Sequence, residues 1–228
     1  MACVGIVGGL GVGATVHYYE RIAAACKARG VTPDLVITHA DVDHGQGLVR
    51  AGKLDELAAY LCGFLDRMAR AGADFMVLPA VTPHIAIDRL KKMSPRPLID
   101  IVETLGAELR ARRLRRVALL GTVFTMQGSL WGQLERYVPG VEIVKPQPDE
   151  IAFAGAAYQR ILDTQRADPA DAEAYRRLAA ELQRRDGVEA ILLAGTDLAL
   201  MFDETTAGFH AIDVARLHID AIVERLTS

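Results

Sequence analysis

Short apolar runs rich in β-branched residues alternate with amphipathic stretches along the whole chain. Each run is four or five residues long, as expected for a buried strand. The expected strands are Val4–Val7, Leu35–His39, Phe75–Leu78, Leu98–Val102, Val117–Leu120, Val141–Val144 and Ala190–Leu193. Between them, helical spacing appears at Leu57, Leu61, Phe64, Leu65 and Met68, at Tyr175, Leu178 and Leu182, and at Val214, Leu217, Ala221 and Ile222. This alternation predicts βαβ units and therefore an α/β protein with parallel sheets.

The second half of the chain repeats the pattern of the first. A strand ends at Gly8, enters a glycine turn and is followed by a helical pattern, and the strand before Gly121 does the same. From Gly8 to Ala80, just after a later strand, is 72 positions, and from Gly121 to Gly195 it is 74. Matched spacing predicts two pseudo-symmetric lobes, each a parallel sheet flanked by helices.

The predicted lobe boundaries follow from two candidate crossings of the chain. Residues 1–96 with 208–228 are expected to form lobe one, and residues 97–207 lobe two. Small ligands bind at the carboxyl ends of parallel strands, so we expect the loops there to face a ligand cleft between the lobes.

Composition excludes several classes of protein. The net charge of −3 gives no general attraction to nucleic acid or anionic lipid, and no apolar run approaches the ~20 residues of a membrane span. The basic run at 110–116 follows a helical pattern, where positive charge suits the helix end. Cys3, Cys26 and Cys62 have no metal-ligand spacing and predict buried, reduced thiols in a cytoplasmic protein.

The loop after the first strand is rich in glycine. Gly9, Gly11 and Ala14 match the G-x-G-x-x-A form of the dinucleotide fingerprint. That fingerprint needs an acidic residue about 20 positions further on, whereas Asp41 and Asp43 lie more than 30 positions away. Backbone N–H groups at a helix start also bind carboxylates, and this interpretation is favoured over a dinucleotide site or a simple tight turn.

The corresponding loop of lobe two offers hydroxyl groups. Thr122 and Thr125 lie at the expected junction between a strand and a helix. They are either ligand-binding groups or a plain helix cap. Residues 79–84 and 194–197 form a third and a fourth loop at equivalent places. His44 follows the second strand and is either a ligand-binding residue or a surface-loop residue.

Several separate motifs, in order along nearly the whole chain, resemble the aspartate/glutamate racemase family. They are Gly8-Gly9-Leu10-Gly11 with Ala14-Thr15 and Tyr18-Tyr19, Leu120-Gly121-Thr122 with Thr125-Met126, and the ending Asp213…His218. The stretch Thr38–His44 resembles the broad-specificity amino-acid racemase branch.

The resemblance implies the fold of a family of cofactor-independent enzymes. Its usual members transfer protons with two cysteines, one in each lobe. These lie in loops resembling Pro-Cys-Asn-Thr-x-His and Gly-Cys-Thr-Glu, and the matching positions here are Ala80 and Gly195. Neighbouring residues also differ, with Val81 for the asparagine and Asp197 for the glutamate. Neither Ala80 nor Gly195 can carry a proton, so the two-thiol mechanism is excluded.

Two classes of function remain. In the first, the chain is an enzyme for a small amino or carboxylic acid, using one-base isomerase, decarboxylase or lyase chemistry. His84 or Asp197 then acts as acid or base, while Thr82, Thr196 and loop N–H groups stabilise an enolate-like charge. In the second, it binds such an acid without turnover. The expected binding residues are Gly9, Gly11, Thr82, Thr122, Thr125, Thr196 and His44, with no cofactor or metal, no nucleic-acid or membrane partner, and a homodimer compatible with the family.

Each of these side chains also has a structural alternative. His84 can cap a helix or pair with a carboxylate, Asp197 can cap a helix, and Thr82 precedes a proline that favours extended backbone. His218 is expected to be a satisfied helix histidine packed near lobe one, and Asp213 the N-cap of the last helix.

Overall fold

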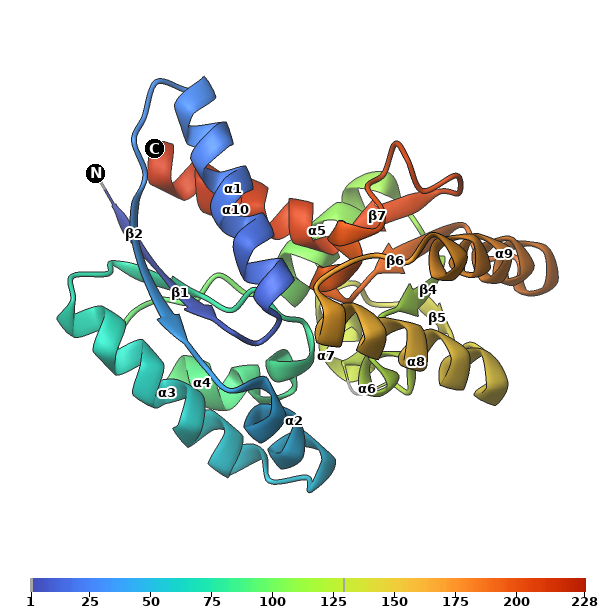
Figure 1. The fold of residues 1–228 in the computed structure, drawn as a ribbon, viewed down its shortest axis with the longest axis horizontal. Coiled ribbons are helices and arrows are strands. Elements are labelled where there is room, and N and C mark those ends of the chain that lie inside the picture. The colour runs from blue at the N-terminus through green and yellow to red at the C-terminus, as the bar shows by residue number, and fades with distance from the viewer. Residues whose placement is uncertain (1, 129) are drawn as a thin grey trace. The chain divides into compact units, whose positions relative to one another are not determined.

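A computed structural model describes residues 2–128 and 130–228, and its helices and strands alternate as predicted. The chain divides into two compact units (Figure 1). Unit 1 comprises Met1–Ile101 and His218–Ser228, and unit 2 comprises Val102–Leu217.

Unit 1 is built on a three-stranded parallel sheet in the order β2-β1-β3. Its elements are β1 (Cys3–Gly8), α1 (Val12–Ala28), β2 (Asp34–His39), α2 (Val42–Arg50), α3 (Leu54–Arg70), β3 (Phe75–Val77), the 3₁₀ turn η1 (Thr82–Ala86), α4 (Ile87–Met93) and the last part of α10 (Val214–Thr227). Figure 1 shows α1 on one side of this sheet and α3 with α4 on the other.

The central strand β1 is buried along its whole length, which explains its continuous apolar sequence. Gly5 faces α3, because a Cβ there would lie 3.1 Å from Met68 Cβ, and Gly8 faces α1 at Thr15. The predicted helical stripe of Leu57 to Met68 is the buried face of α3, as expected from its spacing.

Unit 2 is built on a four-stranded parallel sheet in the order β5-β4-β6-β7. Its elements are most of α5 (Ile101–Arg112), then β4 (Arg116–Leu120), α6 (Val123–Met126), α7 (Trp131–Tyr137), β5 (Glu142–Val144), α8 (Pro148–Thr164), α9 (Pro169–Asp186), β6 (Ala190–Leu193), the 3₁₀ turn η2 (Thr196–Leu200), β7 (Ala211–Asp213) and the first part of α10.

The helices of unit 2 begin and end where the sequence provides caps. Gln147 and Glu150 form a reciprocal capping box at the start of α8. Asp168 accepts a hydrogen bond from the Ala170 N–H, and Gly187 ends α9 in the left-handed conformation. These signals place α8 and α9, whose apolar faces supply much of the unit 2 core.

One predicted strand is wrong. Only Leu98 of the segment Leu98–Val102 forms a bridge, with Met76, and α5 begins at Ile101. Leu105 and Leu109 continue the buried pattern of Ile101 at helical spacing, so the apolar run belongs mainly to a helix. The strand β7 was not predicted, because its three residues stand alone between a turn and α10.

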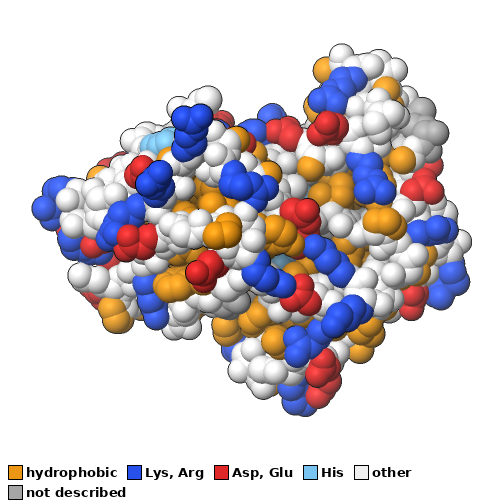
Figure 2. All heavy atoms as spheres, turned by 180° about the vertical axis from the view of Figure 1, so that it is seen from behind, with side chains coloured by type: hydrophobic (Ala, Val, Ile, Leu, Met, Phe, Trp, Pro, Cys, Tyr) orange, Lys and Arg blue, Asp and Glu red, His pale blue; other side chains and the backbone are white. Residues whose placement is uncertain are grey.

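Among the described residues, no helix is both long and apolar enough to cross a bilayer. On the face shown in Figure 2, Lys and Arg side chains are interspersed with Asp and Glu and with small apolar areas. The three cysteines are buried and reduced, as predicted.

Candidate functional site

The glycine turn after β1 is held closed by a threonine. Thr15 Oγ1 accepts a hydrogen bond from the Gly9 N–H at 3.1 Å and donates to the Gly11 carbonyl at 2.8 Å. Gly9 has φ +81°, and a Cβ there would lie 2.3 Å from the Ala40 carbonyl oxygen, so only glycine fits. Gly11 is the N-cap of α1. Because the first N–H groups of a helix lack intrahelical partners, the start of this long helix favours a negative charge.

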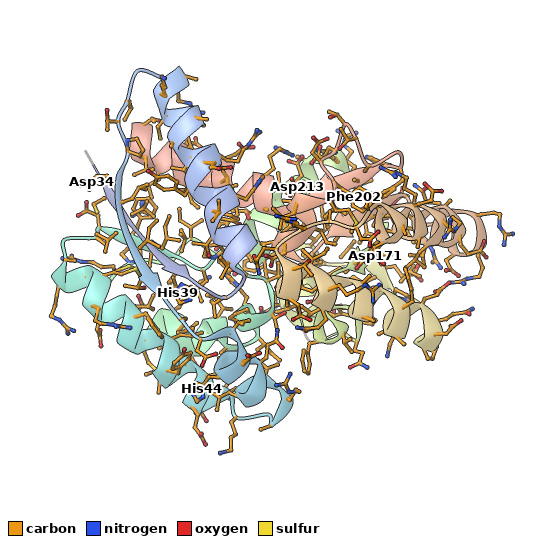
Figure 3. All side chains as sticks on the ribbon, viewed as in Figure 1. Asp34, His39, His44, Asp171, Phe202 and Asp213 are labelled. Atoms are coloured by element: carbon orange, nitrogen blue, oxygen red, sulfur yellow. The ribbon has the colours of Figure 1, made fainter. Side chains whose placement is uncertain are left out.

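The residues after β2 form a helix start rather than a loop. Asp41 caps α2 by accepting hydrogen bonds from the Asp43 and His44 N–H groups at 2.9 and 3.2 Å. His44 is exposed in the first turn of α2, where Figure 3 labels it, with its ring edge-to-face against Tyr60 at 4.6 Å between centroids. Asp41 is therefore used in capping, which further weakens the dinucleotide interpretation of the glycine turn.

The third loop of unit 1 is tied down by His84. Its ring is fully buried in η1, and Nδ1 donates to the Ala80 carbonyl at 2.8 Å. The Ile101 N–H approaches Nε2 at 3.5 Å, and this pattern assigns the proton of the neutral ring to Nδ1. Burial lowers the pKa of His84 from its usual value, so the ring is neutral at physiological pH. Thr82, at the start of the same turn, is partly buried.

A second buried histidine lies beside His84. His218 Nδ1 accepts from the Tyr18 hydroxyl at 3.0 Å, and Nε2 donates to the Ile99 carbonyl at 3.1 Å. The two imidazole centroids are 6.4 Å apart, and burial lowers the pKa of His218 to about 3. The adjacent Asp100 carboxylate is buried and pairs with Lys91 at 2.8 Å. His218 is thus the satisfied helix histidine that the sequence predicted.

The fourth loop, in unit 2, holds a buried carboxylate. Asp197 is 1% exposed in η2, and the Tyr158 hydroxyl donates to its Oδ2 at 3.0 Å. Thr196 precedes it and is equally buried. A Cβ built at Gly195 would lie 2.3 Å from Tyr158 Cε2 and 3.0 Å from its hydroxyl oxygen. The phenol of Tyr158 therefore occupies the space next to Gly195 that a side chain there would need.

The loop after β4 adjoins this fourth loop. A Cβ at Gly121 would lie 2.7 Å from the Ala194 carbonyl oxygen, so the two backbones are in close contact. Thr122 caps α6 by accepting a hydrogen bond from the Thr125 N–H at 3.2 Å, and the two hydroxyls are 3.0 Å apart. Thr122 is thus the cap of α6 and Thr125 is not, and the Thr122 hydroxyl is already engaged with Thr125.

Asp213 also has the expected capping role. At the junction of β7 and α10, labelled in Figure 3, its Oδ1 accepts from the Ala215 and Arg216 N–H groups at 2.9 and 3.1 Å. Within the part of the chain that the structure describes, no group of three His, Cys, Asp or Glu residues is arranged to hold a metal ion. Burial raises the pKa of the Cys3 thiol to about 11, so this thiol is protonated at neutral pH.

Two polar residues of these sites, Tyr158 and Asp100, were not singled out by the sequence, and Tyr18 was named only within a motif that resembles the racemase family. Tyr158 and Tyr18 occur in helices among buried apolar positions, where a tyrosine is interpreted as a residue of the hydrophobic core. Asp100 lies inside the apolar run that was interpreted as a strand. A buried tyrosine usually finds a partner for its hydroxyl, and this is the signal that could have pointed to Tyr18 and Tyr158.

Comparison with known proteins assigns the family. The model of the Asp/Glu/hydantoin racemase family matches residues 7–222, nearly the whole chain. The chain belongs to this family. The recognition from sequence is thereby confirmed, as is the α/β fold with two helix-flanked parallel sheets.

Several solved structures have folds similar to that of this racemase-family protein. A protein from Yersinia pestis described as a candidate Asp/Glu racemase has a TM-score of 0.85 at 23% identity, with 100% of both chains covered. An aspartate racemase homologue from Pyrococcus horikoshii OT3 has a TM-score of 0.83 at 23% identity, again with 100% of both chains covered. A glutamate racemase from Francisella tularensis, solved with D-glutamate, has a TM-score of 0.68 at 13% identity, covering 99% of this chain and 81% of that one.

Proposed function

We propose that this racemase-family protein binds a small amino or carboxylic acid at the carboxyl ends of its strands and acts on it without the two-cysteine mechanism. The chemistry is one-base isomerisation, decarboxylation or elimination, with no cofactor. The neighbouring structure of a glutamate racemase with D-glutamate supports an amino acid or a related carboxylate as the ligand class.

The observation that carries the proposal is the matched placement of hydrogen-bond donors. In unit 1 the glycine turn of Gly9 and Gly11 leads into the start of α1. In unit 2 Thr122 and Thr125 occupy the equivalent turn after the central strand β4. Backbone N–H groups and hydroxyls at the carboxyl ends of parallel strands are suited to hold a carboxylate. Thr82, Thr196 and His44 complete the proposed binding set.

The proposed acid–base groups are His84 and Asp197, with Thr82 and Thr196 stabilising developing negative charge. His84 is neutral and donates from Nδ1, so it fits the role of positioning the third loop around Ala80 as well as that of a base. Asp197 is a carboxylate at the start of η2 with a proton donor already aligned to it. Asp197 is therefore the stronger candidate for the base.

Binding without turnover is the second candidate function. It is favoured by one observation, namely that both ring nitrogens of His84 face backbone groups of the protein itself. A histidine bonded in this way holds the third loop in place, and this structural role requires no catalytic function.

Proton NMR in D₂O with a panel of amino acids, dicarboxylates and malonates separates the two candidates. Loss of an α-proton signal or of a carboxyl group supports an enzyme and identifies the substrate class. Saturation-transfer signals from one compound without any chemical change support a binding protein. Absence of both chemical change and saturation transfer for every compound would refute the proposed ligand class.

A further inference from the structure

Gly195 leaves the fourth loop without a side chain at the carboxyl end of β6, and a phenol from another element stands there instead. The Tyr158 hydroxyl oxygen is 3.0 Å from the ideal Cβ position of Gly195, and the ring carbon Cε2 is closer, at 2.3 Å. Tyr158 comes from α8, a helix far from Gly195 in the sequence. A proton-bearing oxygen is thus supplied to a loop whose own residue 195 cannot supply one.

The packing of α8 fixes the phenol in this place. A Cβ at Gly155, one turn before Tyr158, would lie 2.4 Å from Val123 Cγ2, so α8 packs closely against α6. Tyr158 is itself 5% exposed within the core of unit 2. Burial and the nearby Asp197 carboxylate raise the pKa of Tyr158 well above its usual value, so the hydroxyl keeps its proton at neutral pH.

The hydrogen bond between Tyr158 and Asp197 has a definite direction. The phenol is the only one of the two that carries a proton when Asp197 is ionised, and it donates to Oδ2 at 3.0 Å. The Asp197 backbone N–H also donates to the phenol oxygen, so the second lone pair of that oxygen is the one that can accept a proton from the bound acid. This is the orientation that a two-step proton relay toward the carboxylate requires.

We propose that Tyr158 and Asp197 form a proton relay, in which Tyr158 contacts the bound acid beside Gly195 and Asp197 is the terminal base. This assignment rests on the proposed function and adds to it a catalytic residue, Tyr158. Asp197 acts through the phenol, because it positions the Tyr158 hydroxyl and receives the proton of that hydroxyl.

The relay conserves protons and electrons. The α-carbon of the bound acid gives its proton to the Tyr158 oxygen while the original phenol proton moves to Asp197 Oδ2. The C–H electron pair stays on the substrate as an enolate-like carbanion, the phenol remains neutral, and the carboxylate becomes a carboxylic acid. Reversal of the same two transfers returns a proton to the carbon, so the step needs no oxidant, reductant or further reactant.

Tyr158→Phe tests the relay, because it keeps the ring and removes only the hydroxyl. Tyr175→Phe is the matched control, since Tyr175 is a buried tyrosine of the same core whose hydroxyl donates to the Ala154 carbonyl at 2.8 Å. For each protein, α-proton exchange in D₂O is measured on the compound that the wild type binds, together with saturation-transfer binding and the circular dichroism spectrum. We expect Tyr158→Phe to slow exchange by ~10²-fold or more with binding retained, because loss of a general acid or base has an effect of this size.

Four results would overturn the assignment. Equal exchange rates in Tyr158→Phe and wild type would remove Tyr158 from the chemistry. Equal slowing in Tyr175→Phe would show that loss of any buried hydroxyl has the same effect. Binding by the wild type without exchange would refute the relay alone, whereas absence of binding to every compound would refute the proposed function as well. Asp197→Asn provides a second variant, in which we expect exchange to fall as far as in Tyr158→Phe.

Discussion

Replacing Gly195 by alanine tests whether the Tyr158 phenol fills the space beside the fourth loop. The backbone at Gly195 is extended, with φ −130° and ψ 115°, a conformation that alanine adopts freely. With empty space at this position, Gly195→Ala would stabilise the protein by about 0.4–1 kcal/mol through the unfolded state. The structure predicts the opposite sign.

The expected cost follows from the distance of 2.3 Å between the new Cβ and Tyr158 Cε2. Carbon atoms pack at about 3.5–4.0 Å, so the ring must retreat by at least ~1.2 Å. Overpacking of a buried site costs about 1–3 kcal/mol. Loss of the hydrogen bond to Asp197 on that movement adds about 1.5–3 kcal/mol when the carboxyl is ionised. We expect a net destabilisation of about 2 kcal/mol or more.

Urea denaturation followed by circular dichroism measures this change, with Gly132→Ala as the control. Gly132 lies exposed in α7 with open space around it, so its replacement by alanine should stabilise the protein. Tyr158→Leu shortens the side chain that meets the new methyl group. In that background Gly195→Ala should cost little, which gives a coupling energy of about 2 kcal/mol in a double-mutant cycle. A stabilising Gly195→Ala, or additive effects in the cycle, would refute the reasoning.

Three further results are expected. Between pH 7 and pH 5 the wild type should lose about 2 kcal/mol more unfolding free energy than His218→Gln. The pKa of His218 lies at about 3 in the folded state and near its usual value of about 6.5 in the unfolded state, so only the unfolded state gains the proton. Urea titrations at both pH values measure this loss, with the exposed His210→Gln as the control, and an equal loss in wild type and His218→Gln would contradict it. Gly9→Ala should lower the urea midpoint strongly, since its Cβ would meet the Ala40 carbonyl at 2.3 Å with φ +81°, and an unchanged midpoint would contradict the turn geometry. Thr125→Val should weaken ligand binding by roughly tenfold in saturation-transfer titrations, the effect of one hydrogen bond of about 1.4 kcal/mol, and unchanged affinity would remove Thr125 from the binding set.

The architecture could be predicted because strand and helix periods are local properties of the sequence. The buried stripe of α3 and the cap at Asp168 both follow from residues close together in the chain. The segment Leu98–Val102 was assigned to the wrong element because a short apolar run has no period of its own. Leu98 does form a bridge with Met76 of β3, and only the helical recurrence at Leu105 and Leu109 shows where α5 begins.

The side chains of the candidate site were predictable by position but not by partner. The sequence places His84 and Asp197 in segments that follow strands, and the structure has them in the 3₁₀ turns η1 and η2, after β3 and β6. It does not reveal that His84 donates to a carbonyl only four residues earlier, or that Asp197 receives the hydroxyl of Tyr158, 39 residues away. Such pairings depend on how helices pack on a sheet, and spacing alone does not encode them.

Gly195 and Tyr158 show why a residue missing from an expected position is best interpreted together with what fills its space. The resemblance assigns Gly195 the place of a proton-carrying thiol, and glycine by itself suggests a lost function. In the structure that space is filled by a phenol that donates to a buried carboxylate. Restoring a side chain at residue 195 would therefore displace Tyr158 and break its bond to Asp197. The glycine and the tyrosine form one coupled arrangement, so a cysteine at 195 requires a smaller residue at 158 before it can fit.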